Sequence, residues 1–229
     1  MYLPIEELKQ KLQEPLPGVT SHLKMAPRQR ADEYSGLNGL KPLARNSAVL
    51  ILLFPENGLL KTVFIKRSVY DGVHSGQISF PGGKYENTDT SFEVTALRET
   101  KEEIGVDRDE IEIIGQLTDF YIPPSNFLVK VFVGYSAQQP IYITDKKEVQ
   151  SVVEVNLDDF YDPRNISEKE FYSTSRKLKI VAPCYMINNV EIWGATAMIV
   201  SELLDVLNPT TISSNTKHKT SNLSNESTS

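Results

Sequence analysis

The stretch from Phe80 to Val106 constrains the fold most strongly, because a chain turn, a polar loop and an acidic segment follow one another in it. Pro81, Gly82 and Gly83 end a preceding strand, since proline lacks a backbone N–H and glycine adopts conformations that other residues avoid. After the polar loop a helix is expected to start near Thr90. We therefore predict a strand, a turn and then a helix.

Capping residues set the ends of this helix. Thr90 and Glu93 have the spacing of a capping box, in which two side chains satisfy backbone N–H groups of the first turn. Gly105 suits the left-handed position just past a helix end. The caps predict a helix from about residue 91 to about residue 104.

Each residue of an α-helix is rotated by about 100° from the one before it, and this rotation places the residues of the predicted helix on two faces. Leu97 and Ile104 point one way and should be buried. Glu99 and Glu103 point nearly the opposite way, with Glu102 at the edge of the same arc. Neighbouring carboxylates repel each other, and a hard cation such as Mg²⁺ or Mn²⁺ would stabilise them. The acidic face is therefore a candidate metal site.

The acidic face also has an ordinary explanation: a solvated surface on which Arg98 and Glu102 form an i, i+4 ion pair. The preceding loop favours the metal instead. Gly82 and Gly83 let the backbone approach a ligand closely. A glycine turn that leads into an acidic helix favours a site for metal and phosphate.

Residues 98–106 read Arg-Glu-Thr-Lys-Glu-Glu-Ile-Gly-Val, and together with Gly83 they resemble the Nudix box. The tail of that box is Arg-Glu-x-x-Glu-Glu-x-Gly-hydrophobic. Gly83 lies one residue further from the tail than in the commonest form, and Asp89 or Thr90 replaces the usual first glutamate. The resemblance covers roughly residues 46–207 and implies an α+β fold, with a mixed β-sheet core sandwiched between α-helices.

The resemblance to Nudix hydrolases also implies a mechanism. Glu99, Glu102, Glu103 and the backbone carbonyl of Gly83 would hold Mg²⁺ or Mn²⁺. The metal would offset negative charge on the phosphoryl oxygens and lower the pKa of a bound water from 15.7 towards about 7. Glu102 or Glu103 would take the proton of this water, and Arg98 would orient the carboxylates by charge-assisted hydrogen bonds.

The segment before the box resembles the coenzyme A diphosphatase branch of this family. In that branch an Arg-Ser pair precedes a His-x-Gly-Gln-x-x-Phe-Pro-Gly-Gly run. The matching residues are Arg67, Ser68, His74, Gly76, Gln77 and Phe80 to Gly83, and residues 193–196 resemble a C-terminal feature of the branch. This resemblance implies cleavage of coenzyme A or its derivatives to 3′,5′-ADP and 4′-phosphopantetheine.

Four residues are candidates for binding the substrate. Arg67 would contact the 3′-phosphate of coenzyme A, or it is an ordinary charge at a strand end. His74, with Gln77 beside it, contacts the substrate or holds the glycine turn. Tyr121 stacks on the adenine or is simply a loop tyrosine. Glu148 is a further candidate for a metal ligand or base, at a position that no motif fixes.

Two other functions stay open. The same chemistry would serve ADP-ribose, dinucleoside polyphosphates or nucleotide sugars. A non-catalytic, nucleotide-sensing module is the alternative of a different class. All three glutamates of the box are present and no basic DNA-binding segment is attached, which favours catalysis.

Composition limits the partners of the chain. A net charge of −6 argues against a nucleic-acid surface, so we expect a small nucleoside diphosphate derivative as the partner. The single cysteine, Cys184, forms no internal disulfide, which fits a reducing compartment. No segment reaches about 18 continuous apolar residues. We therefore expect a cytoplasmic protein with no membrane partner, either a monomer or a homodimer.

The 229 residues suit one domain with appendages. We predict an N-terminal helix and arm over residues 1–42, a Nudix hydrolase domain over 43–207 and a disordered polar tail over 208–229. The arm carries Lys24, Arg28 and Arg30 and is expected to be an irregular surface segment or a source of positive charge for the substrate. Strands are predicted at residues 47–54, 59–66, 111–117, 128–135, 152–155 and 177–187, with Pro183 breaking the last of them, and a last helix at 195–207, which residues 192–197 open. The turn at residues 55–58 predicts a hairpin between the first two strands, and residues 121–126 are expected to form a loop.

Overall fold

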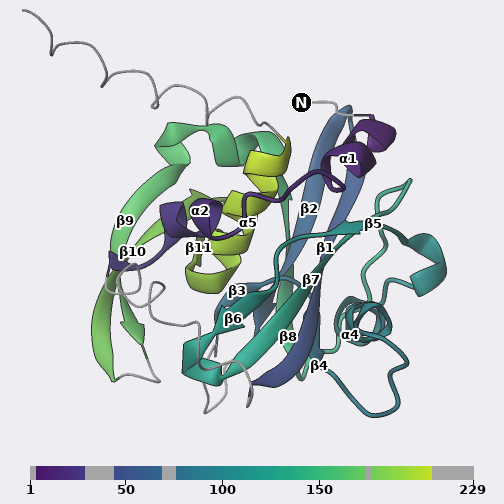
Figure 1. Cartoon of the computed structure of the whole chain (residues 1–229), viewed down its shortest axis with the longest axis horizontal. Coiled ribbons are helices and arrows are strands. Elements are labelled where there is room, and N and C mark those ends of the chain that lie inside the picture. Colours follow the sequence, from purple (N-terminus) through teal and green to yellow (C-terminus); the bar gives the residue numbers. More distant parts are fainter. Residues whose placement is uncertain (1–3, 29–43, 69–75, 174–176, 208–229) are drawn as a thin grey trace, which may run out of the picture.

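The computed structural model describes residues 4–28, 44–68, 76–173 and 177–207. It shows a large mixed sheet with one helix on one face, and a helix and a smaller sheet on the other (Figure 1). Three predicted features lie outside the described residues: the rest of the arm with Arg30, the residue His74 and the polar tail. None of the helices in the described ranges is long and apolar enough to span a membrane.

The large sheet has the strand order β3-β2-β1-β7-β5, and β4, β8 and β6 pair with β1, β2 and β7 respectively. Only the pairing of β1 with β7 is parallel among the recorded strand pairs of this sheet. The strands are β1 (Arg45–Glu56), β2 (Leu59–Arg67), β3 (Ile78–Ser79), β4 (Gly82–Lys84), β5 (Glu112–Gln116), β6 (Phe120–Ile122), β7 (Phe127–Tyr135) and β8 (Val149–Asn156).

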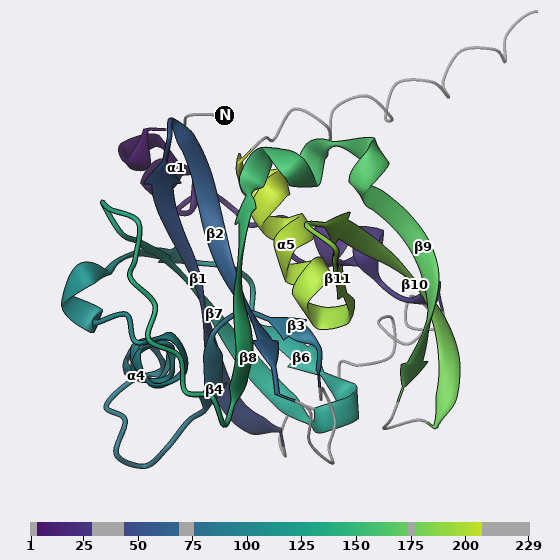
Figure 2. The same cartoon turned by 180° about the vertical axis from the view of Figure 1, so that it is seen from behind.

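Strand β1 lies at the centre of the core because both of its faces are buried. Leu50 and Leu52 contribute to a cluster on the side of α4 (Phe92–Ile104). Ile51 and Leu53 contribute to the larger cluster on the side of α5 (Gly194–Leu207). Burial on both faces explains why the strand reads as one continuous apolar run. The expected sheet core between helices is confirmed (Figure 2).

The predicted hairpin between the first two strands is confirmed. Strands β1 and β2 are antiparallel, and Glu56 pairs with Leu59 across a two-residue turn. Asn57 and Gly58 have φ angles of 51° and 77°. A two-residue turn that matches the twist of its strands needs positive φ at both central positions, and asparagine and glycine tolerate it best.

Helix α4 ends where its sequence predicts but begins with a different cap. Ser91, not Thr90, is the N-cap, and its side chain accepts a hydrogen bond from the backbone N–H of Val94. The expected capping box at Thr90 and Glu93 is therefore wrong. Gly105 is the left-handed C-cap with a φ of 78°, as predicted.

The smaller sheet was only partly foreseen. It consists of β9 (Ile166–Ser173), β10 (Leu178–Ile187) and β11 (Val190–Trp193), with β10 in the middle. Strand β10 runs through Pro183, which was expected to break it. Trp193 ends β11 rather than opening the last helix. The expected loop at residues 121–126 contains β6 and the short 3₁₀ helix η5 (Pro123–Ser125).

The N-terminal segment contradicts the expected irregular surface arm where it is described. Helix α1 (Ile5–Lys11) is the expected N-terminal helix, but the described residues after it form α2 (Val19–His22) and η1 (Leu23–Met25). Ser21 and His22 are buried against α5. Their polar character hides this burial in the sequence, because their partners are the acidic residues Glu202 and Asp205 of a distant helix.

Candidate active site

The site is built where α4 passes beneath β4. Glu103 is only 2% exposed, and its Oε2 accepts a 2.8 Å hydrogen bond from the backbone N–H of Gly82. Its Oε1 accepts a 3.2 Å hydrogen bond from Nη1 of Arg67 at the end of β2. The acidic face of α4 is thus not a solvated surface at this residue, because β2 and β4 cover it, and Gly82 and Gly83 belong to strand β4 rather than to the expected turn.

Glu99 lies directly against the second glycine of the turn. A Cβ atom built at Gly83 would approach the two carboxylate oxygens of Glu99 to 2.4 Å. Any side chain at this position would displace the carboxylate. Gly83 therefore allows the close approach of backbone and carboxylate that a shared metal ligand set requires.

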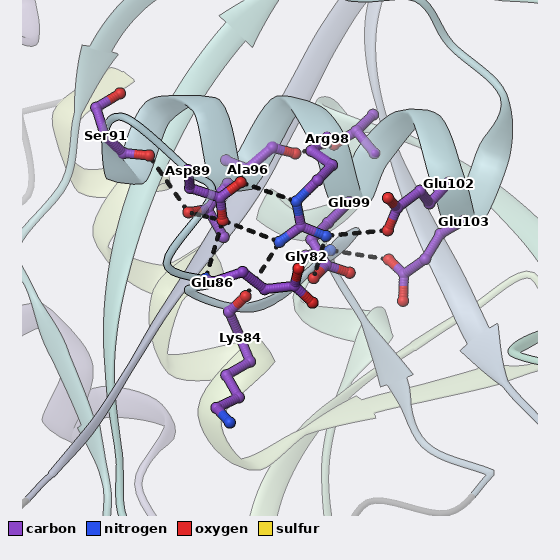
Figure 3. Close-up of polar contacts among 12 residues, drawn as sticks. Gly82, Lys84, Glu86, Asp89, Ser91, Ala96, Arg98, Glu99, Glu102 and Glu103 are labelled. Atoms are coloured by element: carbon purple, nitrogen blue, oxygen red, sulfur yellow. Dashed lines mark hydrogen bonds and ion pairs between the residues drawn. The ribbon is translucent and has the colours of Figure 1, made fainter.

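Arg98 fixes the arrangement of the remaining carboxylates (Figure 3). Its Nη1 donates 3.0 Å hydrogen bonds to both Glu99 and Glu102. Its Nε and Nη2 donate to the two oxygens of Asp89, at 2.9 and 3.0 Å. Two parallel hydrogen bonds to one carboxylate orient a guanidinium strongly. The structure thus places Arg98 beside the acidic residues, as its position in the box predicts.

Asp89, rather than Thr90, takes the place of the first glutamate of the box. Its side chain is buried and also accepts hydrogen bonds from the backbone of Glu86 and the hydroxyl of Thr95. Hydrogen bonds from Arg98 lower the pKa of Asp89 to about 2. Thr90 is exposed. Asp89 is therefore a permanent anion that anchors Arg98, a role that the sequence did not predict.

Burial and crowding of like charges determine the electrostatics of the cluster. Burial raises the pKa of Glu103 to about 7, and the nearby charges of Glu99 and Glu148 add to the rise. Burial also raises the pKa of Glu99, although Arg98 opposes the change. Burial disfavours the charged form of both carboxylates, and a cation bound between them would favour it.

Glu148 joins this cluster from the chain before β8. Its backbone carbonyl accepts a 2.8 Å hydrogen bond from the N–H of Ser68, the residue after β2. The next residue, Val149, pairs with Arg67 across the sheet. Arg67 in turn contacts Glu103. Glu148, whose position no motif fixes, therefore lies close to the carboxylates of α4.

The chemistry of the donor set fits a divalent metal. The oxygens of Glu99, Glu102, Glu103 and Glu148 are hard ligands of the kind that Mg²⁺ and Mn²⁺ prefer. Within the described residues, no three acidic, histidine or cysteine side chains already surround one point. These carboxylates instead form hydrogen bonds with Arg98, Arg67 and the backbone of Gly82. A bound metal would have to replace some of these hydrogen bonds.

The candidate substrate residues fall into two groups. Arg67 contacts the carboxylates, and its backbone N–H donates a 3.0 Å hydrogen bond to the carbonyl of Gln77. Tyr121 lies on β6 and donates a 2.9 Å hydrogen bond to Asn126. The structure thus joins Arg67 and Gln77 to the cluster, whereas Tyr121 belongs to the β6–β7 hairpin.

The C-terminal feature at residues 193–196 packs near the same strand. The Thr196 hydroxyl donates a 2.9 Å hydrogen bond to the carbonyl of Ile78 in β3. Ile78 directly follows Gln77. The two segments that resemble the coenzyme A diphosphatase branch, one before the box and one at residues 193–196, therefore meet here although they lie far apart in the sequence.

Comparison with known proteins gives consistent matches. A family model described as NUDIX domain matches residues 44–175 of this chain. Nudix hydrolase 3 of Caenorhabditis elegans is 32% identical over 72% of this chain and 75% of its own length. The uncharacterized Nudix hydrolase NudL of Escherichia fergusonii is 32% identical, over 69% of this chain and 81% of its own length. The mitochondrial coenzyme A diphosphatase NUDT8 of Homo sapiens is 30% identical, over 75% of this chain and 73% of its own length.

Proposed function

Because the chain belongs to the Nudix family of diphosphate hydrolases, we propose that it cleaves the diphosphate bond of coenzyme A or one of its derivatives. The products would be 3′,5′-ADP and 4′-phosphopantetheine. The observation that carries this proposal is the position of Arg67 and Ser68. This pair, which resembles the coenzyme A branch, contacts Glu103 through a side chain and Glu148 through the backbone. The similarity to a human coenzyme A diphosphatase supports the same substrate.

Nudix hydrolases generally use divalent metal ions. In this chain Glu99, Glu102 and Glu103, with the backbone carbonyl of Gly83, would hold Mg²⁺ or Mn²⁺. The bound metal supplies positive charge to the phosphoryl oxygens and lowers the pKa of a coordinated water. Arg98, anchored by Asp89, holds Glu99 and Glu102 in position for this set.

A carboxylate must accept the proton of the attacking water. Glu103 is only 2% exposed, so we assign it to holding the metal rather than to taking the proton. Glu102 has 59% of its side chain exposed and is within reach of solvent. Glu148 lies at the edge of the cluster. These two residues are the candidate bases, and no protein nucleophile is needed.

A substrate screen tests the proposal. Purified full-length chain is incubated with coenzyme A, dephospho-coenzyme A, ADP-ribose or diadenosine tetraphosphate, in Mg²⁺ or Mn²⁺. We expect coenzyme A to give the highest kcat/KM, with activity lost in chelator and in Glu99→Gln. A higher kcat/KM for ADP-ribose or the dinucleotide would overturn the substrate. A lack of turnover on all four compounds would overturn the proposed function altogether.

A further inference from the structure

The segment before β8 donates hydrogen bonds to carbonyl groups at the C-terminal end of α4. The last carbonyl groups of a helix have no partner within the helix. Here the backbone N–H of Ile143 donates a 2.9 Å hydrogen bond to the carbonyl of Ile104. The N–H of Asp145 donates a 3.2 Å hydrogen bond to the carbonyl of Glu103. Residues 143–145 are therefore tied to the same helical turn that carries the buried carboxylate.

Gly105 has a second role beyond its left-handed conformation at the C-cap, because it leaves room for the backbone of Ile143. A Cβ atom built at Gly105 would lie 2.7 Å from the carbonyl oxygen of Ile143 and 2.9 Å from its backbone nitrogen. Backbone atoms cannot move aside as a flexible side chain can. The absence of a side chain at Gly105 thus sets how closely residues 143–145 approach α4.

A tight turn connects this contact to Glu148. The carbonyl of Asp145 accepts hydrogen bonds from the N–H groups of Glu148 and Val149, at 3.1 and 2.8 Å. The Asp145 side chain accepts a 2.8 Å hydrogen bond from the N–H of Lys147. On the other side, Ser68 holds the Glu148 carbonyl. The backbone of Glu148 is therefore fixed between α4 and β2.

The side chain of Ile143 does not anchor the segment that leads into this turn, although the preceding Tyr142 packs against the core. Ile143 is 74% exposed, so its hydrophobic contacts contribute little. We propose that Gly105 and Asp145 are positioning residues, which use the end of α4 to hold Glu148 beside Glu99 and Glu103. This inference rests on the proposed function, because it gives Glu148 its role at the metal.

Binding of Mn²⁺ alone, measured by electron paramagnetic resonance, provides a first test that needs no turnover. Gly105→Ala should weaken Mn²⁺ binding by about tenfold, the scale reported for groups that orient metal ligands. Gly58→Ala is the matched control, because Gly58 has a φ of 77° and nothing within 4 Å of its Cβ position. It carries the same backbone strain without the close contact, and it should leave Mn²⁺ affinity unchanged.

Asp145 provides a second variant, because it is exposed and its substitution should not prevent folding. Asp145→Ala removes the acceptor for Lys147 and should weaken Mn²⁺ binding. Asp145→Asn keeps an acceptor oxygen in the same place and should restore it. Equal effects of the two substitutions would show that the charge of Asp145, rather than the turn, matters, and this would overturn its positioning role.

A double-mutant cycle separates positioning from general stability. In a Glu148→Gln background, Gly105→Ala and Asp145→Ala should change Mn²⁺ affinity and kcat by less than about twofold, because the group they position is already disabled. Full additivity of the losses would overturn the inference. If the protein cleaves none of the diphosphates, the proposed function fails, while the Mn²⁺ cycle still decides whether Gly105 and Asp145 act through Glu148.

Discussion

Glu103 combines two demands that conflict in most carboxylates, since it is buried and must be ionised to hold a metal. Glu103→Gln keeps the shape of the side chain and removes its charge. We expect kcat to fall roughly 10²–10⁴-fold, the range for a positioned catalytic group. Glu93→Gln, on the exposed first turn of α4, is the control and should retain kcat. Near-normal kcat in Glu103→Gln would exclude Glu103 from the metal site.

The raised pKa of Glu103 predicts a pH dependence of stability in the metal-free protein. Burial raises this pKa from 4.5 to about 7 in the folded chain. Between these two values the folded state keeps a proton that the unfolded state has lost, so the free energy of unfolding falls as pH rises through this window. The loss is at most about 3 kcal/mol. Urea denaturation in chelator at pH 5 and pH 8 should show it in the natural chain but not in Glu103→Gln.

The sequence predicted which residues gather at the site better than how they are held. The spacing of the box identified Glu99, Glu102 and Glu103, and the structure places them together. The burial of Glu103 was missed, because helix periodicity describes one helix and not the glycine turn that covers it. The role of Asp89 was also missed, since its partner Arg98 is defined by the folded loop.

Helix α5 forms an unusual buried junction through Glu202. Oε1 of this carboxylate accepts hydrogen bonds from the N–H of Gly18 at 3.1 Å and the Thr118 hydroxyl at 2.5 Å. Oε2 lies 2.8 Å from Nε2 of His22. Burial opposes its ionisation, yet hydrogen bonds from His22 and Thr118 lower the pKa of Glu202 on balance. One side chain therefore joins α5, the N-terminal segment and the connection from β5 to β6.

Glu202→Ala should be strongly destabilising for this reason. It leaves the hydrogen-bond donors of Gly18, His22 and Thr118 without their acceptor, and each buried donor left unpaired costs about 1–3 kcal/mol. Denaturant unfolding measures the change, with Glu14→Ala on the surface as a control expected to stay within about 0.5 kcal/mol. Because the folded pKa of Glu202 is lowered, its contribution is present above the unfolded value and is lost as pH falls. A loss below about 1 kcal/mol would contradict the junction.

Long strands were predictable and short or charged ones were not. Strands β1, β2 and β7 are apolar enough to show their burial directly in the sequence. Strand β9 has four polar residues in a row, Ser167 to Glu170, and shows no such signal. Pro183 was expected to break β10, but the pairing of β10 with β11 begins only at Cys184. Proline is tolerated on that unpaired side, because no neighbouring strand there needs its missing N–H.

The whole molecule has a core that extends beyond the matched family region. That region covers residues 44–175, whereas Leu8 of α1 and Leu203 of α5 belong to the largest hydrophobic cluster. Leu8→Ala should cost about 2–5 kcal/mol in the free energy of unfolding. Because α1 packs on β5 and α5, away from the carboxylates, kcat below the melting temperature should be retained. A loss of kcat without a loss of stability would show that α1 contributes to the site.

The parallel pairing of β1 with β7 also governs how the chain reaches its folded state. Arg45 pairs with Phe127, 82 positions later, so the central strand finds this neighbour only after α4 and β5 have been synthesised. Contacts between distant parts of a chain form slowly, because a long loop must close first. A newly made β1 therefore lacks this neighbour for that interval, and its face toward α5 stays uncovered until residues 194–207 have been made. During synthesis we expect this strand, rather than the acidic site, to be the part of the protein most prone to aggregation.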